Sequence, residues 1–372
     1  MIATRLADAL AERDHDVWVG AAAPSYRAIS DLIVPRASRV TVRRSRPAKD
    51  RFRTYANYHL ALVSWAREIR KADVVLSMSP PLSVGTIASL LGAGKPTVYN
   101  VQDVFAEFLK RTGKVRNGAL LHLLESLERF TYARTSALVT VGESQREFLI
   151  KQGVAARKVS TIENFADVDS IGPRSLDIDY RRAQGIPVDA FCVLYAGNFG
   201  LVNDLDLLLS TTEALSGRKD VVFVFSGGGR EWARAAAFAE GKGNIVLLGQ
   251  RPVSELPRIY AAANVGLVTL RRGLSSCSVP SKTYTILASG RPFIAAIDAD
   301  SDVAVIAGRS GGGVAVGPGD ASAFSTAILQ LASDRERASR MGEAGYRYVL
   351  DNNTPTKIAQ RYEALFERVV KE

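Results

Sequence analysis

The chain has 372 residues, a formal net charge of +10, and a composition of 47% hydrophobic and 23% charged residues, which is typical of a folded globular protein. A single hydrophobic core stops growing at about 250–300 residues, so the length predicts two domains. No run approaches the roughly 18 apolar residues of a transmembrane helix, no signal peptide is apparent, and the two cysteines, Cys192 and Cys277, indicate neither a disulfide framework nor a metal cluster. We therefore expect a cytoplasmic protein.

Both halves of the chain alternate short apolar runs with longer amphipathic segments, which predicts α/β domains with parallel sheets wrapped by helices. The expected strands are, in chain order, residues 15–20, 72–78, 95–101, 136–142 and 159–162, and then 191–197, 220–227, 244–249, 265–270, 292–297 and 312–317. A polar, turn-rich stretch at 165–190 separates the halves. The domains are expected at 1–168 and 185–350, with a final helix at 354–372 that packs back on the first.

Most of the net positive charge lies in residues 36–71, where eleven Lys and Arg residues outnumber two acidic residues. The segment runs into residues 52–71, whose aromatic and leucine side chains can line one helical face beneath a basic rim. Such a face suits anionic lipid headgroups, so we expect the segment to bind an anionic membrane surface. A solvated loop is the alternative reading, and no nucleic-acid-binding motif is present.

Residues that break regular structure follow the expected strands, and in open parallel sheets this edge binds ligands. The loops in question are residues 79–85, 100–107, 163–167, 195–200, 226–229, 249–270, 278–292 and 311–320. This ordered series resembles the GT-B glycosyltransferases of family 4, in particular the bacterial O-antigen, capsule and exopolysaccharide subgroup with the colanic-acid and N-acetylfucosaminyl transferases. The resemblance covers the whole chain. It implies two Rossmann-like domains facing a central cleft, the first binding the acceptor and the second the nucleotide-sugar.

Three departures from the family pattern accompany this resemblance. Family members begin with a strand and a Gly-rich loop, whereas Met1 stands inside the helix that follows them, so we expect an open sheet edge or an uncovered slot in the first domain. Two family glutamates correspond to Cys277 and Thr285. The family's Arg and Lys that hold the diphosphate correspond to Asn198 and to Val202 or Asn203. Members of the subgroup share the last two changes, which indicates a variant donor site.

The stretch from Ser275 to Gly290 enters a helix through Pro280, and helix N-termini favour anions. Ser278 or Ser281 can cap this helix, and Lys282 adds a positive charge. We expect Ser281 and Lys282 to hold the donor diphosphate and to stabilise its charge as the glycosidic bond breaks. An ordinary capped helix with a solvated lysine is the alternative.

Other loops complete the expected donor site. Gly197 and Gly200 let backbone approach a phosphate, and Asn198 can donate a hydrogen bond to it. The resemblance assigns contacts with a uracil base to Gln250 and Arg251, and contacts with the sugar and ribose to Ser278 and Thr285. The alternatives are a plain strand–helix turn and a surface loop.

In the first domain Asp103 follows a buried strand, and the resemblance places this position at the sugar or acceptor. Asp103 could orient or deprotonate the acceptor hydroxyl, and Glu107 could share its face if the segment is helical. A helix cap is the alternative. The three histidines, His15, His59 and His122, have no ligand spacing, so no metal cofactor is expected.

The predicted function is transfer of a sugar, an N-acetylated deoxyhexose or hexosamine, from a UDP donor to a polyprenyl-diphosphate-linked acceptor at the inner face of the plasma membrane. The resemblance implies a retaining reaction. Two alternatives stay open: a nucleotide-sugar 2-epimerase of the same architecture, which the scarcity of histidine disfavours, and a catalytically silent scaffold.

Overall fold

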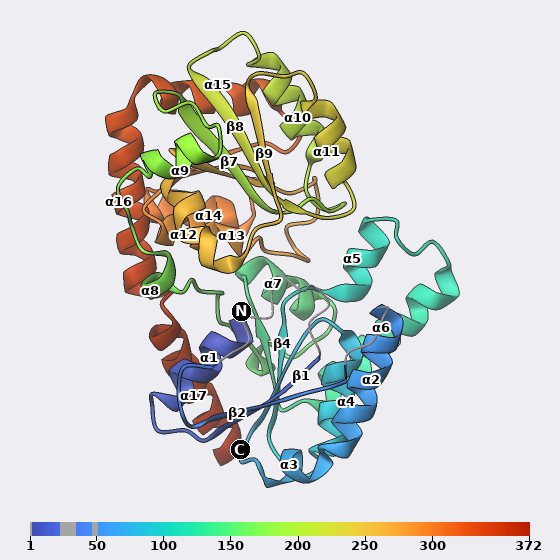
Figure 1. Ribbon diagram of the computed structural model, residues 1–372. Helices are drawn as coiled ribbons and strands as arrows, with labels where there is room; N and C mark the ends of the chain where they lie inside the picture. The colour runs from blue at the N-terminus through green and yellow to red at the C-terminus, as the bar shows by residue number, and fades with distance from the viewer. Residues whose placement is uncertain (1, 23–34, 47–50) are drawn as a thin grey trace. The chain divides into compact units, whose positions relative to one another are not determined.

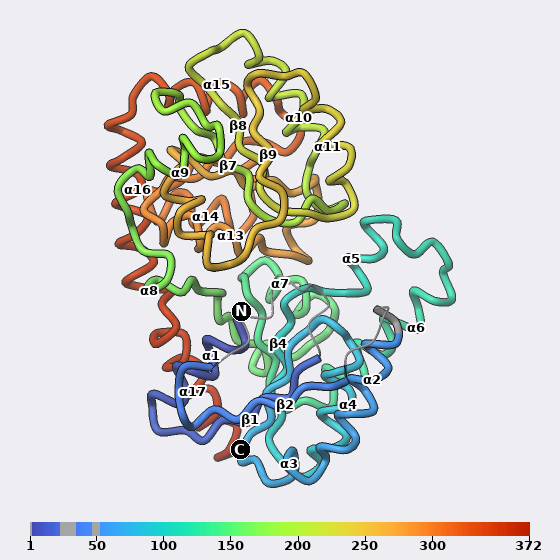
Figure 2. The backbone as a smooth tube through the Cα atoms, in the orientation of Figure 1, coloured from blue at the N-terminus to red at the C-terminus, as the bar shows by residue number. Residues whose placement is uncertain are grey.

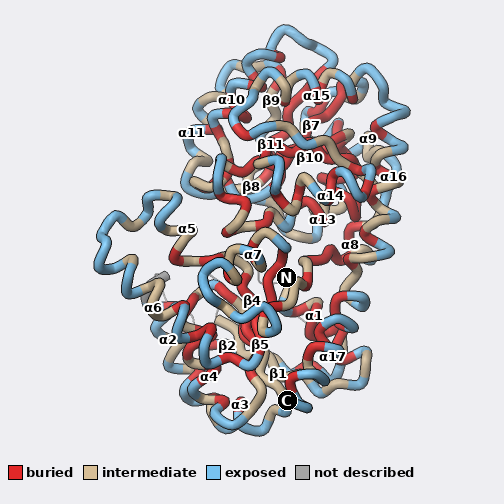
Figure 3. The backbone as a smooth tube through the Cα atoms, turned by 180° about the vertical axis from the view of Figure 1, so that it is seen from behind, coloured by how far each residue is buried: buried red, intermediate tan, exposed pale blue. Residues whose placement is uncertain are grey.

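The computed structural model describes residues 2–22, 35–46 and 51–372 (Figure 1). The chain divides into two compact units. The first unit contains Met1–Asn164, Ser276–Val279 and Pro355–Glu372, and the second contains Phe165–Ser275 and Pro280–Thr354. Buried residues concentrate along the strands of each unit, with exposed residues on the outer helices (Figure 3).

The second unit is built on one sheet of six parallel strands. The strands are β7 (Phe191–Asn198), β8 (Val221–Gly228), β9 (Ile245–Gly249), β10 (Val265–Thr269), β11 (Phe293–Ala296) and β12 (Gly313–Val316). Their spatial order is β12-β11-β10-β7-β8-β9, so the direction of winding reverses between β7 and β10. In a doubly wound sheet the crevice for ligands lies at such a reversal, at the carboxyl ends of the strands.

Helices cover both faces of this sheet. They are α8 (Val168–Ile171), α9 (Ile178–Ala183), α10 (Leu205–Ala214), α11 (Trp232–Ala239), α12 (Leu256–Ala261), α13 (Lys282–Ala288), α14 (Asp302–Ser310), α15 (Ala321–Ser333) and α16 (Arg335–Asn352), with a 3-10 turn η3 (Val253–Glu255). The core joins strand residues such as Phe223 and Phe225 to Leu208 of α10 and Phe324 of α15, all at most 1% exposed. The apolar runs of the sequence are therefore strands buried on both faces, as parallel sheets require.

The first unit contains two separate parallel sheets. One has the order β3-β4-β5-β6 and the other pairs β1 with β2. The strands are β1 (Val17–Ala21), β2 (Val40–Arg44), β3 (Val75–Met78), β4 (Thr97–Val101), β5 (Ala137–Thr140) and β6 (Val159–Thr161). Among the described residues, β1, β2, β3 and β6 each have one edge without a strand partner. Every open sheet has such edges, so the expected open edge or uncovered slot stays a prediction.

The first unit contains eight α-helices among its described residues, and the first and last of them come from opposite ends of the chain. These helices are α1 (Ile2–Ala11), α2 (Arg51–Ser64), α3 (Ala66–Lys71), α4 (Leu82–Leu91), α5 (Phe105–Arg111), α6 (Gly118–Arg134), α7 (Glu143–Lys151) and α17 (Pro355–Lys371), with a 3-10 turn η2 (Ala156–Lys158). Helix α17 lies against α1, as Figure 2 shows. Both Arg13 and His15 contact Glu363 of α17.

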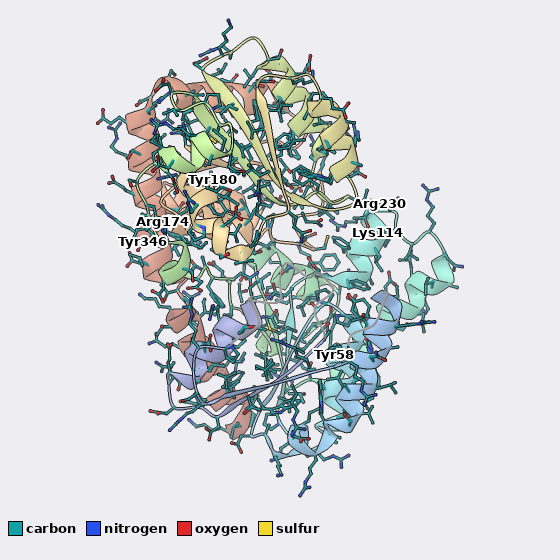
Figure 4. All side chains as sticks on the ribbon, in the orientation of Figure 1. Tyr58, Lys114, Arg174, Tyr180, Arg230 and Tyr346 are labelled. Atoms are coloured by element: carbon teal, nitrogen blue, oxygen red, sulfur yellow. The ribbon has the colours of Figure 1, made fainter. Side chains whose placement is uncertain are left out.

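The basic segment 36–71 forms β2, α2 and α3 where it is described. Two aromatic side chains of the segment are not on the expected surface face: Tyr58, labelled in Figure 4, is 8% exposed and Trp65 is 6% exposed, and both pack with Trp18. On the outer side of α2, Leu60 and Val63 are 70% and 59% exposed. Tyr55 of α2 is 45% exposed as well, so the surface face of this helix combines aliphatic and aromatic side chains.

Candidate functional site

The loops that follow β7 and β8 interlock at the carboxyl edge of the second unit's sheet. The two strands pair as far as Gly197 with Gly227 and Asn198 with Gly228. A Cβ at Gly227 would lie 1.8 Å from the carbonyl oxygen of Gly197, and Gly227 has a φ of +143°. Only glycine fits at this position. The sequence-predicted loop of Gly197, Asn198 and Gly200 is thus held by a second glycine loop.

Lys282 lies directly over this loop. Its Nζ is buried and has no hydrogen-bond partner among the described residues, while the residue as a whole is half-buried. Nζ stands 3.9 Å from the ring centroid of Tyr195, and a Cβ at Gly197 would lie 3.6 Å from Nζ and from Cε. Burial lowers the pKa of Lys282 to about 7. An ammonium group beside an aromatic face is stabilised by the ring, but a buried cation without an anion is costly.

Tyr195 connects this lysine to the loop. Its ring faces Nζ, and its hydroxyl donates a hydrogen bond of 3.1 Å to the carbonyl oxygen of Asn198. That carbonyl also accepts from Nδ2 of Asn203 at 2.8 Å. Asn203 stands near the family's lysine position, and here it supports the loop backbone. Asn198 itself is an exposed residue. Nothing in the sequence marked Tyr195, because a tyrosine within an apolar strand reads as core.

The start of α13 differs from the expected cap. Ser281 occupies the N-cap position without a side-chain capping bond, since its φ and ψ of −64° and −18° are already helical. A capping hydroxyl needs a non-helical backbone. Ser281 is exposed, and Thr285 lies within α13 as a half-buried residue. The N-cap position belongs to Ser281, and Ser278 is part of the first unit.

The two residues predicted to contact the base, Gln250 and Arg251, have different neighbours in the structure. The site of a Cβ at Gly228 lies 3.6 Å from Oε1 of Gln250, so Gln250 reaches the glycine loops. Arg251 instead donates to the carbonyl oxygen of Leu248 at 2.8 Å and to Oε1 of Gln184 at 2.7 Å. The structure thus brings Gln250 to the candidate site and holds Arg251 in the surrounding framework.

In the first unit, Asp103 and Ser278 lie side by side. They form an isolated antiparallel bridge, and the amide of Val104 donates to the carbonyl oxygen of Cys277 at 3.0 Å. Burial raises the pKa of the Asp103 carboxyl, opposed by a hydrogen bond from Ser278 and by the charge of Lys114. A carboxyl group with a raised pKa is closer to the range of a general base. Ser278 therefore contacts the predicted acceptor-side residue.

Glu107 lies on α5, and Asp103 precedes that helix. The Glu107 carboxylate accepts from Nε of Arg111 at 2.6 Å and lies 3.8 Å from Lys110. Burial raises the pKa of Glu128, a residue that the sequence did not single out, to about 7. Oε1 of Glu128 caps α5 by accepting from the amide of Phe105 at 2.8 Å. These pairings give both glutamates structural partners.

Gln145, which is fully buried on α7, fastens residues 276–279 to the first unit. Its Nε2 donates to the carbonyl oxygens of Gln102 at 3.0 Å and Cys277 at 3.3 Å, and its Oε1 accepts from the amide of Val141 at 3.1 Å. The side chain is 0% exposed. Its role could not be predicted from the sequence, because its three partners are backbone atoms that the fold brings near.

Comparison with known families follows this division of the chain. Residues 1–170 match the family model described as Glycosyltransferase Family 4, and residues 190–334 match the one described as Glycosyl transferases group 1. The chain belongs to glycosyltransferase family 4. It is 28% identical over 271 residues to "Probable glycosyltransferase WbjE" of Pseudomonas aeruginosa, covering 70% of this chain. It is 26% identical over 229 residues to "Putative colanic acid biosynthesis glycosyl transferase WcaI" of Escherichia coli, covering 59%.

The matches span 66% of WbjE and 56% of WcaI. Among solved structures, Anabaena Alr3699/HepE in complex with UDP and glucose is similar with a TM-score of 0.73 at 16% identity, over 97% of this chain and 94% of that chain. The family 4 chain thus has the α/β GT-B fold with two Rossmann-like domains built on parallel sheets.

Two general properties of this family 4 chain bear on its chemistry. His, Cys, Asp and Glu side chains within the described ranges do not gather in groups of three that could hold a metal ion. Of the helices in those ranges, none combines the length and apolar character that would let it cross a bilayer.

Cys277, at a family glutamate position, is buried, and burial raises its thiol pKa to about 12, so it stays neutral.

Proposed function

We propose that this family 4 chain transfers a sugar from a UDP-sugar to a lipid-linked acceptor in the synthesis of a cell-surface polysaccharide. The observation that carries the proposal is Lys282, a buried ammonium group without a hydrogen-bond partner at the carboxyl edge of a doubly wound sheet. A donor diphosphate would supply the missing anion. The relatives named as glycosyltransferases, and HepE solved with UDP and glucose, support the same reading.

On the donor side, Lys282 and the backbone of Gly197 and Gly200 bind the diphosphate in this proposal. Lys282 supplies the positive charge that stabilises the departing diphosphate as the glycosidic bond breaks. Gln250 reads the base from beside the glycine loops, and Asn198 donates to a phosphate oxygen. Ser281 and Thr285, on the exposed and half-buried side of α13, contact the diphosphate and the sugar. No metal ion has a part in this scheme. The transferred sugar is an N-acetylated deoxyhexose or hexosamine, as the resemblance implies.

On the acceptor side, Asp103 orients the acceptor hydroxyl and Ser278 holds the Asp103 carboxylate in place. The reaction is retaining in this proposal, with the departing diphosphate accepting the acceptor proton on the same face. Glu107 keeps Arg111 and Lys110 beside this region. Arg251 acts indirectly, by fixing the segment that carries Gln250. The first unit thus serves the acceptor and the second the donor.

Attachment to the inner face of the plasma membrane is the remaining part of the proposal. The exposed Leu60 and Val63 of α2 offer apolar side chains, and the exposed Arg43, Arg44 and Arg46 provide positive charge nearby in the chain. Such a surface binds anionic lipids. Flotation with vesicles of anionic lipid should retain the protein, and Leu60→Ser with Val63→Ser should release it. Leu350→Ser, at an exposed position of α16, is the control, and equal release by the control would refute the assignment.

The experiment that tests the function is a thermal-shift and turnover assay with Lys282→Ala. UDP should raise the melting temperature of the wild type more than GDP does. Lys282→Ala should reduce UDP affinity, read from this thermal shift, and turnover by more than about tenfold each, because one charge-assisted contact is lost. Turnover within about threefold of wild type would remove Lys282 from the site. Asp103→Asn should lower kcat while leaving UDP stabilisation unchanged, which separates acceptor from donor defects.

A further inference from the structure

A cavity of about 330 Å³ lies at the amino-terminal edge of the second unit's sheet. Its lining includes Phe191, the first residue of β7, together with Asn264 and Pro292, which immediately precede β10 and β11. The three strands are parallel, so this edge is opposite to the one that carries the glycine loops. None of the residues of the candidate donor site lines this cavity.

Three arginines line it, and we call it the arginine cavity. Arg174 comes from the segment between α8 and α9 and is labelled beside α16 in Figure 4. Arg291 follows α13, and Arg335 begins α16. All lining residues are described, and none of them is acidic. The cavity therefore concentrates positive charge without a carboxylate in its own wall.

Arg291 is fixed in place by neutral acceptors. Its Nη2 donates to the carbonyl oxygens of Arg174 at 3.0 Å and Ala261 at 3.1 Å, and its Nε donates to that of Tyr260 at 3.3 Å. Behind it, Arg181 is fully buried. Burial and the neighbouring charge of Arg181 lower the pKa of Arg291. Carbonyl oxygens orient a guanidinium group but leave its charge uncompensated.

Arg181 adds a second buried cation on the same side. It donates to the carbonyl oxygens of Ala262 at 2.8 Å and Val188 at 2.7 Å, and to Oδ1 of Asn264 at 2.7 Å. Burial is the main cause that lowers its pKa, and the charge of Arg335 adds to it. Asn264 also lines the arginine cavity, so the buried Arg181 is hydrogen-bonded to a residue of the cavity wall.

Three carboxylates on segments near the arginine cavity have partners of their own. Asp177 is paired with Arg258 at 2.9 Å, and Asp220 is paired with Arg218 at 2.7 Å. Asp334 caps α16 by accepting from the amide of Arg337 at 2.8 Å. Asp189 is a fourth acid on this side: its backbone carbonyl accepts from Nη2 of Arg335 at 2.5 Å, and its charge acts to raise the pKa of Arg181. Since the cavity wall itself holds three arginines and no acid, positive charge still predominates there.

We propose that the arginine cavity binds a small anion that carries phosphate groups, at a site separate from the donor site. Guanidinium groups match phosphate oxygens through paired N–H donors. The N-terminus of the 18-residue helix α16 adds a favourable dipole at Arg335. The volume lies at the lower end of the range for ligand pockets, about 300–1,000 Å³, which favours a compact ligand such as pyrophosphate or a phosphate monoester.

Calorimetric titration with inorganic pyrophosphate at about 150 mM salt tests this site. The proteins are the wild type, Lys282→Ala, the double variant Arg174→Ala with Arg335→Ala, and a control with Arg309→Ala and Arg347→Ala. The control removes the same charge from exposed positions of α14 and α16. The cavity double variant should bind at least about tenfold more weakly, whereas the control should stay within about twofold and Lys282→Ala should retain binding.

Three results would overturn the assignment: no binding by the wild type, equal losses in the control and the cavity variant, or binding lost in Lys282→Ala and kept in the cavity variant. The last result would place pyrophosphate at the candidate donor site. The proposed function has its own readout, which is stabilisation by UDP. A protein that ignores UDP but loses pyrophosphate binding in the cavity variant would refute the function and keep the arginine cavity.

Discussion

Raising the pH from about 6 to about 8 should weaken the binding of a UDP-sugar to this protein about tenfold. The reason is Lys282, whose pKa burial lowers to about 7 in the ligand-free protein. The diphosphate favours the charged lysine, so the bound state keeps the proton throughout this range. The protonated fraction of the free protein falls from about 0.9 to about 0.1 over these two units, and affinity follows that fraction.

Proton uptake measures the same effect directly. Binding at pH 7 should draw about half a proton from solution, with about 0.1 proton taken up at pH 6 and about 0.9 at pH 8. Calorimetry in two buffers that differ in ionisation enthalpy gives this number. A UDP-sugar is a better ligand here than UDP, because its diphosphate does not titrate in this range.

Two variants make the assay decisive. Lys282→Met should bind more weakly and with no dependence on pH, and Lys219→Met, at an exposed lysine of the same unit, should behave as the wild type. The reasoning is refuted if wild-type affinity stays constant from pH 6 to pH 8 with no proton uptake. It is equally refuted if Lys282→Met keeps the pH dependence, since another group would then be titrating.

Four further outcomes are expected. Lys282→Met should raise the melting temperature of the ligand-free protein; this gain is full below about pH 7 and disappears as the pH approaches the ordinary pKa of lysine, about 10.4, as thermal unfolding at several pH values can show. Arg181→Met should lower the unfolding free energy by about 3–5 kcal/mol in urea titrations, because several buried acceptors lose their donor. Gly227→Ala should abolish UDP stabilisation while Gly217→Ala, with open space around it, should not. Gln145→Leu should lower kcat without changing UDP stabilisation; a matching loss of UDP stabilisation would contradict this.

Much of the fold was predictable because parallel strands buried on both faces leave continuous apolar runs. Each of the eleven predicted strands overlaps an observed one. The strand β2 escaped prediction, since its residues Val40–Arg44 are only half apolar and stand among arginines. Tyr58 and Trp65 misled in the opposite direction, whereas Tyr55 is exposed as expected. Periodicity shows that they share a face, but it cannot tell whether that face meets a core or a membrane.

The candidate site was predictable only in its positions along the chain. Loops after strands mark the ligand edge, and this reasoning found Lys282, Gly197 and Asp103. The environment of each depends on distant residues, such as Tyr195 beneath the lysine and Ser278 beside the aspartate. A sequence pattern carries no record of such long-range neighbours. Arg251 illustrates the same limit, because its partner Gln184 lies far away in the chain.

Helix α13 has Lys282 at its first residue, and Arg291 follows shortly after its last. Seven helical residues span about 10 Å, so one short helix joins the lysine of the candidate donor site to the arginine cavity. Binding at its two ends must obey linkage. If pyrophosphate changes the affinity for a UDP-sugar by some factor, the UDP-sugar changes the affinity for pyrophosphate by the same factor, whatever the sign.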